Sequence, residues 1–256
     1  MARAWLATRP HPGWLALIAA ALLAWFLTVQ LAAGMPPGPG AMGLGLAGFL
    51  AGWALMMTAM MLPSLAPLLS AYLRSIRAEH SSWVRAGRTA ALVAGYLLTW
   101  TGFGVLAYAA ALFAGRLATE APVAAAWVGA GLLVAAGIYQ LTPLKNFCLR
   151  HCRSPVAFLL HVSGYQGRFR DVRVGVYHGL YCVGCCWGLM LVLITVGVMN
   201  LAWMAVIAAA VLLEKTWQHG IVFSRVAGAA LIVFACFVPA NPWLLPGLYI
   251  APEMMM

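Results

Sequence analysis

The chain has 256 residues, of which 64% are hydrophobic and only 8% are charged, and its formal net charge is +10. Soluble domains carry about 25% charged residues, so this chain has too few polar side chains to cover a surface exposed to water. The composition therefore predicts an integral membrane protein. Strict two-residue alternation is absent, which argues against a membrane barrel, and the long apolar runs predict that the spans are helices.

Seven apolar stretches approach or exceed the roughly 20 residues that cross a bilayer as a helix. In chain order the expected spans are 14–33, 44–72, 89–115, 122–142, 174–198, 201–217 and 220–238. The first is expected to be a retained helix, with a signal peptide as the alternative. The sixth is short and is either a span or a re-entrant segment. The expected fold class is an all-α, polytopic transmembrane helical bundle of about seven spans, or six if one is re-entrant.

The basic residues predict how the spans are oriented. All fifteen Lys and Arg residues except Arg116 and Arg225 fall on one side of the expected bundle. By the positive-inside rule the N-terminus is expected in the cytoplasm and the C-terminus outside, unless the sixth span is re-entrant. This distribution accounts for the net charge, so no nucleic-acid partner is expected.

The whole chain, residues 1–256, is expected to form a single integral membrane domain. Residues 143–173 are the one sizeable polar segment and are predicted to be a cytoplasmic loop. Within it, the apolar stretch 155–164 is too short to span a bilayer. That stretch lies along the membrane interface or between helices.

Three of the six cysteines lie within five positions, in the apolar stretch YCVGCCWGLM (181–190). On a helix, residues spaced i, i+3 and i+4 share one face, and a histidine and a methionine lie one turn to either side. Thiolate and thioether ligands favour Cu(I) and other soft metals. In the alternative reading, the cysteines are inert core residues and the two glycines pack helices. The residues of this stripe are His178, Cys182, Cys185, Cys186 and Met190.

A second group of soft ligands is predicted on the second span. Met57, Met60 and Met61 share one helical face, and Pro63 is expected to kink the helix and free a carbonyl beside them. The alternative role is packing, since methionine fills irregular gaps well. Counted from the expected span ends, these methionines and the cysteine stripe lie at similar depth.

A third motif lies at the end of the fourth span, where Cys148 and Cys152 are four residues apart. Three basic side chains nearby are expected to lower the pKa values of these thiols: Lys145, Arg150 and Arg153. The alternative is an ordinary basic loop with incidental cysteines.

Glu214 and His219 flank the end of the sixth span. Charged residues in such places often pair internally or mark a pathway. An interfacial anchor formed by Glu214 and Lys215 is the alternative.

Three motifs together resemble the DUF2182 family of bacterial inner-membrane proteins: AMMLPS (59–64), YQLTPLK…CLRHCRSP (139–155) and YCVGCCWGLM (181–190). The resemblance covers roughly residues 45–235. It implies a metal-binding protein of the bacterial inner membrane, with copper as the suggested metal. The candidate ligands that it implies are Met57, Met60, Met61, Cys148, Cys152, Cys182, Cys185 and Cys186, to which the helical stripe adds His178.

The function expected is binding of a soft metal, Cu(I), followed by transport or by delivery to a cuproprotein. The expected partners are membrane lipids and a copper donor or acceptor protein or membrane complex, and an oligomer is compatible with this reading. We do not expect an enzyme. Two alternatives stay open: a membrane thiol–disulfide oxidoreductase that uses Cys182 and Cys185, and a structural or assembly subunit of a larger membrane complex.

Overall fold

The computed structural model describes residues 12–35, 38–79 and 81–250, and the regular structure in these residues is helical. The helices in chain order are α1 (Pro12–Ala33), α2 (Leu46–Ser75), α3 (Ser82–Glu120), α4 (Pro122–Leu141), α5 (Pro143–Arg153), α6 (Pro155–His161), α7 (Arg170–Thr195), α8 (Leu201–Thr216) and α9 (Gly220–Phe237), followed by the 3₁₀ turn η2 (Pro242–Leu244). The all-α fold class is confirmed.

Six helices are long and apolar enough to cross a membrane, namely α1, α2, α3, α4, α7 and α9. The sixth expected span is α8, which has 16 residues. At 1.5 Å per residue it is about 24 Å long, which is less than the roughly 30 Å of a bilayer's hydrocarbon core. Helix length thus supports six membrane spans, and α8 is a shorter helix within the bundle. The cytoplasmic N-terminus stays a prediction, and Arg3 and Arg9 lie outside the described residues.

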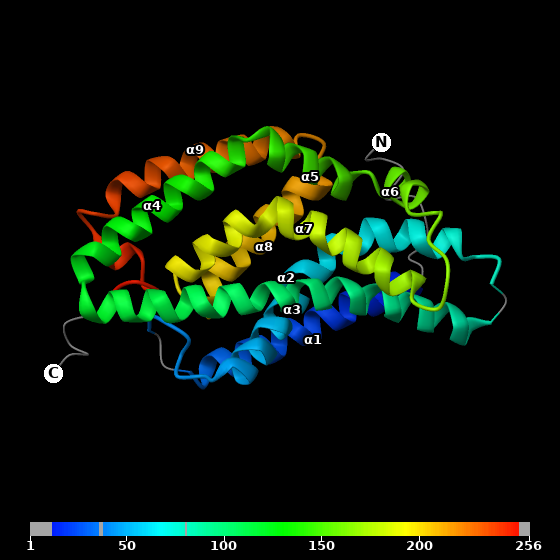
Figure 1. Cartoon of the computed structure of the whole chain (residues 1–256), viewed down its shortest axis with the longest axis horizontal. Helices are drawn as coiled ribbons and strands as arrows, with labels where there is room; N and C mark the ends of the chain where they lie inside the picture. The colour runs from blue at the N-terminus through cyan, green and yellow to red at the C-terminus, as the bar shows by residue number, and fades with distance from the viewer. Residues whose placement is uncertain (1–11, 36–37, 80, 251–256) are drawn as a thin grey trace.

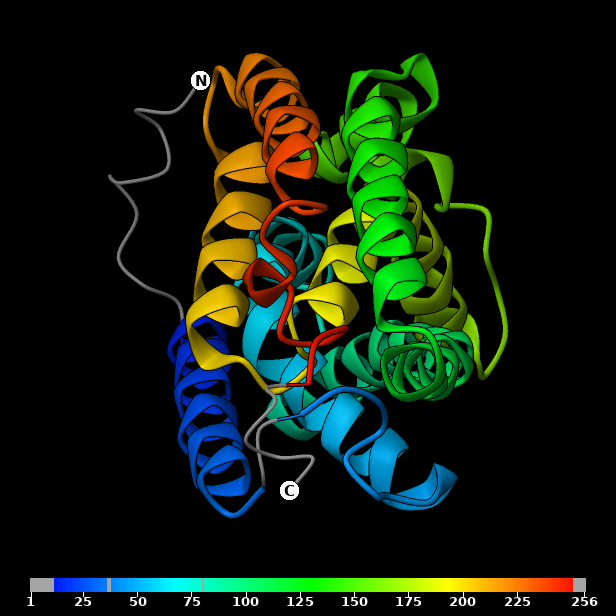
Figure 2. The same cartoon turned by 90° about the vertical axis from the view of Figure 1, so that its left-hand side faces the viewer.

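The helices surround α7, which carries most of the chemistry predicted from the sequence. Helix α3 packs along α7, α1 along α2, and α4 along α9 (Figure 1). In Figure 1, α7 and α8 lie between the α4–α9 pair and α3, and the end-on view in Figure 2 shows α7 in the middle of the bundle. In its most apolar stretch α7 is 67% buried, against 22% for α1 and α9. Most of this stretch of α7 therefore lies against protein.

The close contact between α3 and α7 depends on two glycines. A Cβ atom at Gly95 would collide with the carbonyl oxygen of Val172, and one at Gly175 would collide with that of Leu92. Because neither glycine has a side chain, the two backbones touch directly. This contact sets the distance between Tyr96 on α3 and the cysteines of α7.

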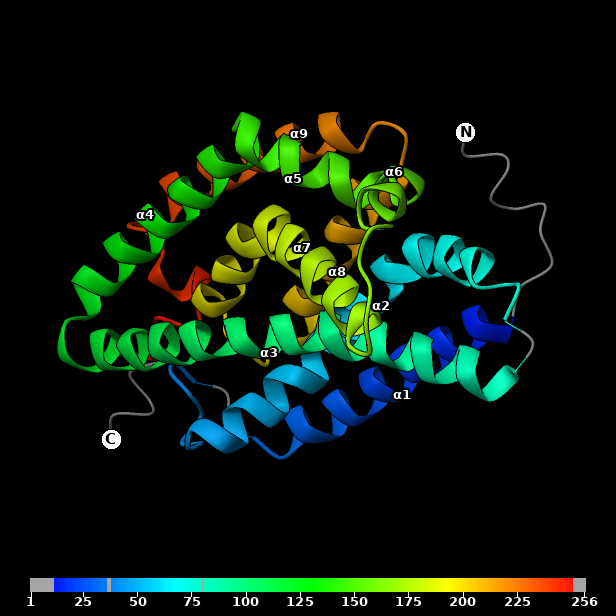
Figure 3. The same ribbon diagram turned by 45° about the vertical axis from the view of Figure 1, so that its right-hand side comes forward.

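Residues 143–173, expected to be a loop, contain the two short helices α5 and α6. Thr142 caps α5 by accepting a hydrogen bond from the backbone N–H of Lys145 at 3.3 Å, and a proline occupies the first turn of each helix. Helix α6 contacts α2 and α5 at one end of the bundle (Figure 3) and buries Phe158 while leaving Leu160 exposed. The apolar stretch 155–164 thus lies on the bundle surface with one side packed inward.

Candidate metal centre

The cysteine stripe of α7 faces the interior of the bundle. Cys182, Cys185 and Cys186 are buried, with exposed fractions of 0–1%, and His178 and Met190 are buried with them. The sulfur atoms of the three cysteines lie within 4.8 Å of one another. A metal bonded to two sulfurs at about 2.3 Å from each holds them no more than about 4.6 Å apart. The three thiols are therefore close to the spacing that a single ion requires.

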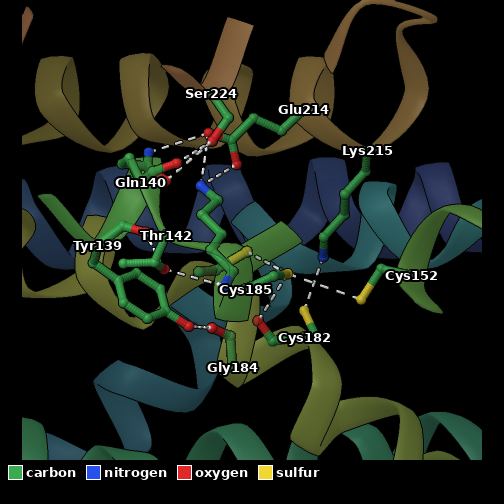
Figure 4. Close-up of polar contacts among 12 residues, drawn as sticks. Tyr139, Gln140, Thr142, Cys152, Cys182, Gly184, Cys185, Glu214, Lys215 and Ser224 are labelled. Atoms are coloured by element: carbon green, nitrogen blue, oxygen red, sulfur yellow. Dashed lines mark hydrogen bonds and ion pairs between the residues drawn. The ribbon is translucent and has the colours of Figure 1, made fainter. Parts of the chain in front are cut away.

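Cys185 is at the centre of this group. Its sulfur lies 3.3 Å from that of Cys186 and 3.8 Å from that of Cys152 on α5, and its thiol donates to the carbonyl oxygen of Cys182 at 3.2 Å (Figure 4). We call Cys152, Cys182, Cys185 and Cys186 the thiol cluster. Two helices contribute to it, so the sequence motifs at 148–152 and 182–186 form one site.

Cys148 lies at the edge of the thiol cluster. It is half-buried, one turn before Cys152, and a Cβ atom at Gly184 would come within 2.9 Å of its sulfur. The glycine therefore leaves room for this sulfur against α7. Cys148 is the most accessible of the five cysteines on α5 and α7.

The expectation that basic neighbours lower the thiol pKa values on α5 is wrong. Burial raises the pKa of Cys148, and hydrogen bonding with Cys182 holds the pKa of Cys152 above its ordinary value. The physical reason is that two of the basic side chains are engaged elsewhere. Lys145 is paired with Glu214, and Arg153 donates to backbone carbonyls at the end of α8 and just beyond it.

Lys215 is a residue of this site that sequence reasoning did not place beside the thiols. Its ammonium donates to the sulfur of Cys182 at 2.8 Å and to the hydroxyl of Ser64 at 3.0 Å, while the hydroxyl of Tyr96 lies 3.0 Å from the same sulfur. Lys215 is only 5% exposed. The available signal was its position near the end of an apolar helix, where a buried cation needs a partner.

Glu214 forms a separate network with α4 and α5, so the interfacial anchor of Glu214 with Lys215 is wrong. Its carboxylate accepts from Lys145 at 2.8 and 2.9 Å and from the side-chain amide of Gln140 at 3.1 Å. The charged groups of Lys145 and Glu214 are both fully buried. Adjacent residues on α8 thus point to different partners, Glu214 to an ion pair and Lys215 to a thiol (Figure 4).

The methionines of α2 and His178 are both placed in the core. Met57, Met60 and Met61 are 0–2% exposed, and Ser64 on the same helix connects α2 to Cys182 through Lys215. His178 has no hydrogen-bond partner at Nδ1 within the described part of the chain. That ring nitrogen is free to bind a ligand. Metal binding by these four residues stays a prediction.

We expect Met57→Leu to weaken Cu(I) binding by less than about tenfold. A thioether is neutral and is a weaker partner for the ion than a thiolate, and leucine fills nearly the same volume. Competition with a Cu(I) chelator under anaerobic conditions measures the change. A loss as large as that of a cysteine variant would make Met57 a principal ligand, and an unchanged affinity would restrict it to packing.

Comparison with known proteins identifies a family for most of the chain. Residues 50–238 match PpoB2, a family described as copper chaperones. The matched range contains all the candidate ligands as well as Lys215 and Glu214. No curated protein and no solved structure matches the chain. The match confirms the expectation of a copper-related family, and the narrower resemblance to DUF2182 stays a prediction.

Proposed function

The chain belongs to this copper chaperone family, and from this premise we propose that it binds Cu(I) in the thiol cluster and delivers it to a cuproprotein. The observation that carries the proposal is the geometry of the sulfurs. Three buried thiols lie within 4.8 Å of one another, and a fourth, from α5, lies 3.8 Å from the central one. Soft sulfur donors favour Cu(I) over harder ions.

The arrangement of thiols also suits transfer of the ion. Cys148 is half-buried at the edge of the cluster, whereas Cys182, Cys185 and Cys186 are enclosed. We propose that copper passes between the protein surface and the cluster by ligand exchange through Cys148. In this exchange the ion binds one thiolate before it dissociates from another. The acceptor is then a protein that presents its own soft ligands at α5 and α6.

We propose this activity for a multi-pass protein of the bacterial inner membrane with a cytoplasmic N-terminus. The support for a membrane location is the set of six long apolar helices. The support for the orientation is the charge distribution along the sequence. The thiols then lie in a protein interior from which water is largely excluded.

We propose a binding and delivery protein rather than a thiol–disulfide oxidoreductase. A thiol exchange reaction requires an accessible sulfur for attack by the partner's thiolate. Cys182 and Cys185 are 0–1% exposed, so neither can form a mixed disulfide with a protein partner without opening the bundle. A reversible two-electron titration that forms a Cys182–Cys185 disulfide would instead favour the oxidoreductase.

The test is the copper content of the whole chain purified in detergent under anaerobic conditions. We expect the wild type to hold Cu(I) and Cys185→Ser to lose most of it, because Cys185 has the closest contacts with other sulfurs. Cys182→Ser and Cys186→Ser should each lower the Cu(I) affinity by at least about tenfold, since each removes one soft sulfur ligand. Chelator competition measures affinity, and elemental analysis measures stoichiometry.

Cys236→Ser is the matched control. Cys236 is an exposed cysteine on α9, and its thiol donates to the backbone carbonyl of Ile232 on its own helix. This variant should keep the wild-type copper content and unfold at the wild-type temperature. Unchanged stoichiometry in the three cluster variants would refute copper binding at the thiol cluster.

A further inference from the structure

Lys215 places a full positive charge against the thiol cluster. Its ammonium is within hydrogen-bond distance of the Cys182 sulfur, and in Figure 4 its side chain extends from α8 toward that sulfur. A 2.8 Å contact between a lysine nitrogen and a cysteine sulfur is short, because sulfur is a large acceptor. The cation is therefore positioned on one of the atoms that we propose to bind copper.

This charge has no carboxylate partner in the part of the chain that the structure describes. The carboxylate beside it in sequence, Glu214, is bound to Lys145, and the remaining ion pairs involve Asp171. The other groups around the Lys215 ammonium are the Ser64 hydroxyl and, across the sulfur of Cys182, the Tyr96 hydroxyl. An isolated buried ammonium is costly, so the anion that compensates it has to come from the thiols.

We propose that Lys215 is the counter-cation of the metal–thiolate group and that it makes the site prefer monovalent over divalent soft cations. This inference rests on the proposed function, because it assumes that the thiol cluster binds a metal. Lys215 is then a specificity-determining residue that does not itself bind the ion.

The charges explain the direction of the preference. A monovalent ion held by two thiolates carries a net charge of −1, and the ammonium of Lys215 brings the site to zero. A divalent ion held by two thiolates is already neutral, so the ammonium is left uncompensated in a medium of low dielectric constant. The divalent ion reaches neutrality only if a third thiol of the cluster also loses its proton, a deprotonation that the monovalent ion does not require. Because a net charge inside a protein is expensive, Lys215 favours Cu(I) and Ag(I).

The test compares metal affinities of Lys215→Met with those of the wild type, using the full chain in detergent. Methionine keeps the unbranched shape of the lysine stem and removes the charge. We expect the affinities for Cu(I) and Ag(I) to fall on the order of 10- to 100-fold, the range expected for loss of a hydrogen bond to a charged group. The affinity for Zn(II) should stay the same or rise, because the variant removes the ammonium that is left uncompensated beside a divalent ion. Anaerobic chelator competition with each metal alone gives the three values.

Two further variants separate charge from packing. Lys215→Arg keeps the charge and should keep the ratio of Cu(I) to Zn(II) affinity within about threefold of wild type. Arg225→Met removes a unit charge from an exposed position on α9 and should leave all three affinities unchanged. Lys215→Gln, which is polar and neutral, should repeat the result of Lys215→Met and replaces it if the methionine variant does not fold.

An equal loss of Cu(I) and Zn(II) affinity in Lys215→Met would overturn the proposal, because it would indicate a general disturbance of the site. An unchanged Cu(I) affinity in that variant would also overturn it. A Lys215→Arg variant in which the ratio of Cu(I) to Zn(II) affinity falls as far as in Lys215→Met would overturn it too. These results differ from failure of the proposed function, which is seen in the wild type as an absence of Cu(I) binding.

Discussion

Replacing Lys145 by methionine should lower the thermal unfolding temperature of the purified chain by roughly 6–20 °C, because it leaves the carboxylate of Glu214 buried without its cation. The two charged groups are fully buried and 2.8 Å apart. Removal of one partner from such a pair lowers the free energy of unfolding by about 3–5 kcal/mol. For a chain of this size, each kcal/mol lowers the unfolding temperature by about 2–4 °C. The measurement is thermal unfolding in detergent followed by circular dichroism.

A double-mutant cycle distinguishes the loss of a partner from the loss of packing. In Lys145→Met combined with Glu214→Gln, no charge is left in the pocket, and Gln140 and the new glutamine can hydrogen bond to each other. Neutral replacement of a buried ion pair is often tolerated. The double variant should therefore regain most of the lost stability. If the stability losses of Lys145→Met and Glu214→Gln simply add in the double variant, the ion pair is not the origin of the lower unfolding temperature.

The same ion pair connects two helices that border the thiol cluster. Lys145 is on α5, which contributes Cys152, and Glu214 is on α8, which contributes Lys215. Gln140 adds a contact from α4, and its backbone and side-chain oxygens accept from Ser224 on α9 at 3.3 and 3.4 Å. This polar network holds α5 and α8 against each other, and so holds Cys152 and Lys215 on the two helices that carry them.

The parts of the site that could be predicted from the sequence are those set by local geometry. Cys182, Cys185 and Cys186 share a face because of the helical repeat, and the lengths of the apolar runs predict the spanning helices. The all-α fold and the buried cysteine face of α7 follow from these two rules. Neither rule needs knowledge of how the helices pack.

The parts that could not be predicted depend on contacts between distant segments. Lys145 looked like a solvated loop residue because its partner, Glu214, is 69 residues away. Lys215 looked like half of a surface pair because its sequence neighbour is acidic. Only the packing of α8 against α2 and α7 shows that its ammonium reaches Ser64 and Cys182. The thiol pKa values on α5 were mispredicted for the same reason, since the positive charges were assigned without their partners.

Substituting alanine for Gly95 should destabilise the bundle by about 1–3 kcal/mol, because the new Cβ atom would collide with the backbone of α7 at Val172. A backbone carbonyl cannot rotate away as a side chain can, so α3 and α7 have to separate. Tyr96 is the next residue, and its hydroxyl lies 3.0 Å from the sulfur of Cys182. The same shift should therefore weaken Cu(I) binding, which chelator competition measures alongside thermal unfolding.

Gly102→Ala on the same helix is the matched control. A Cβ atom at Gly102 would meet nothing within 4 Å, so alanine adds no collision there. Alanine is also the better helix former, by about 0.8–1.0 kcal/mol. Gly102→Ala should therefore unfold at the wild-type temperature or slightly above it, with Cu(I) affinity unchanged. Equal effects of the two substitutions would show that helix propensity, and not the contact between α3 and α7, decides the stability of this region. A stable Gly95→Ala variant with reduced Cu(I) affinity would show that the contact positions the site without limiting the fold.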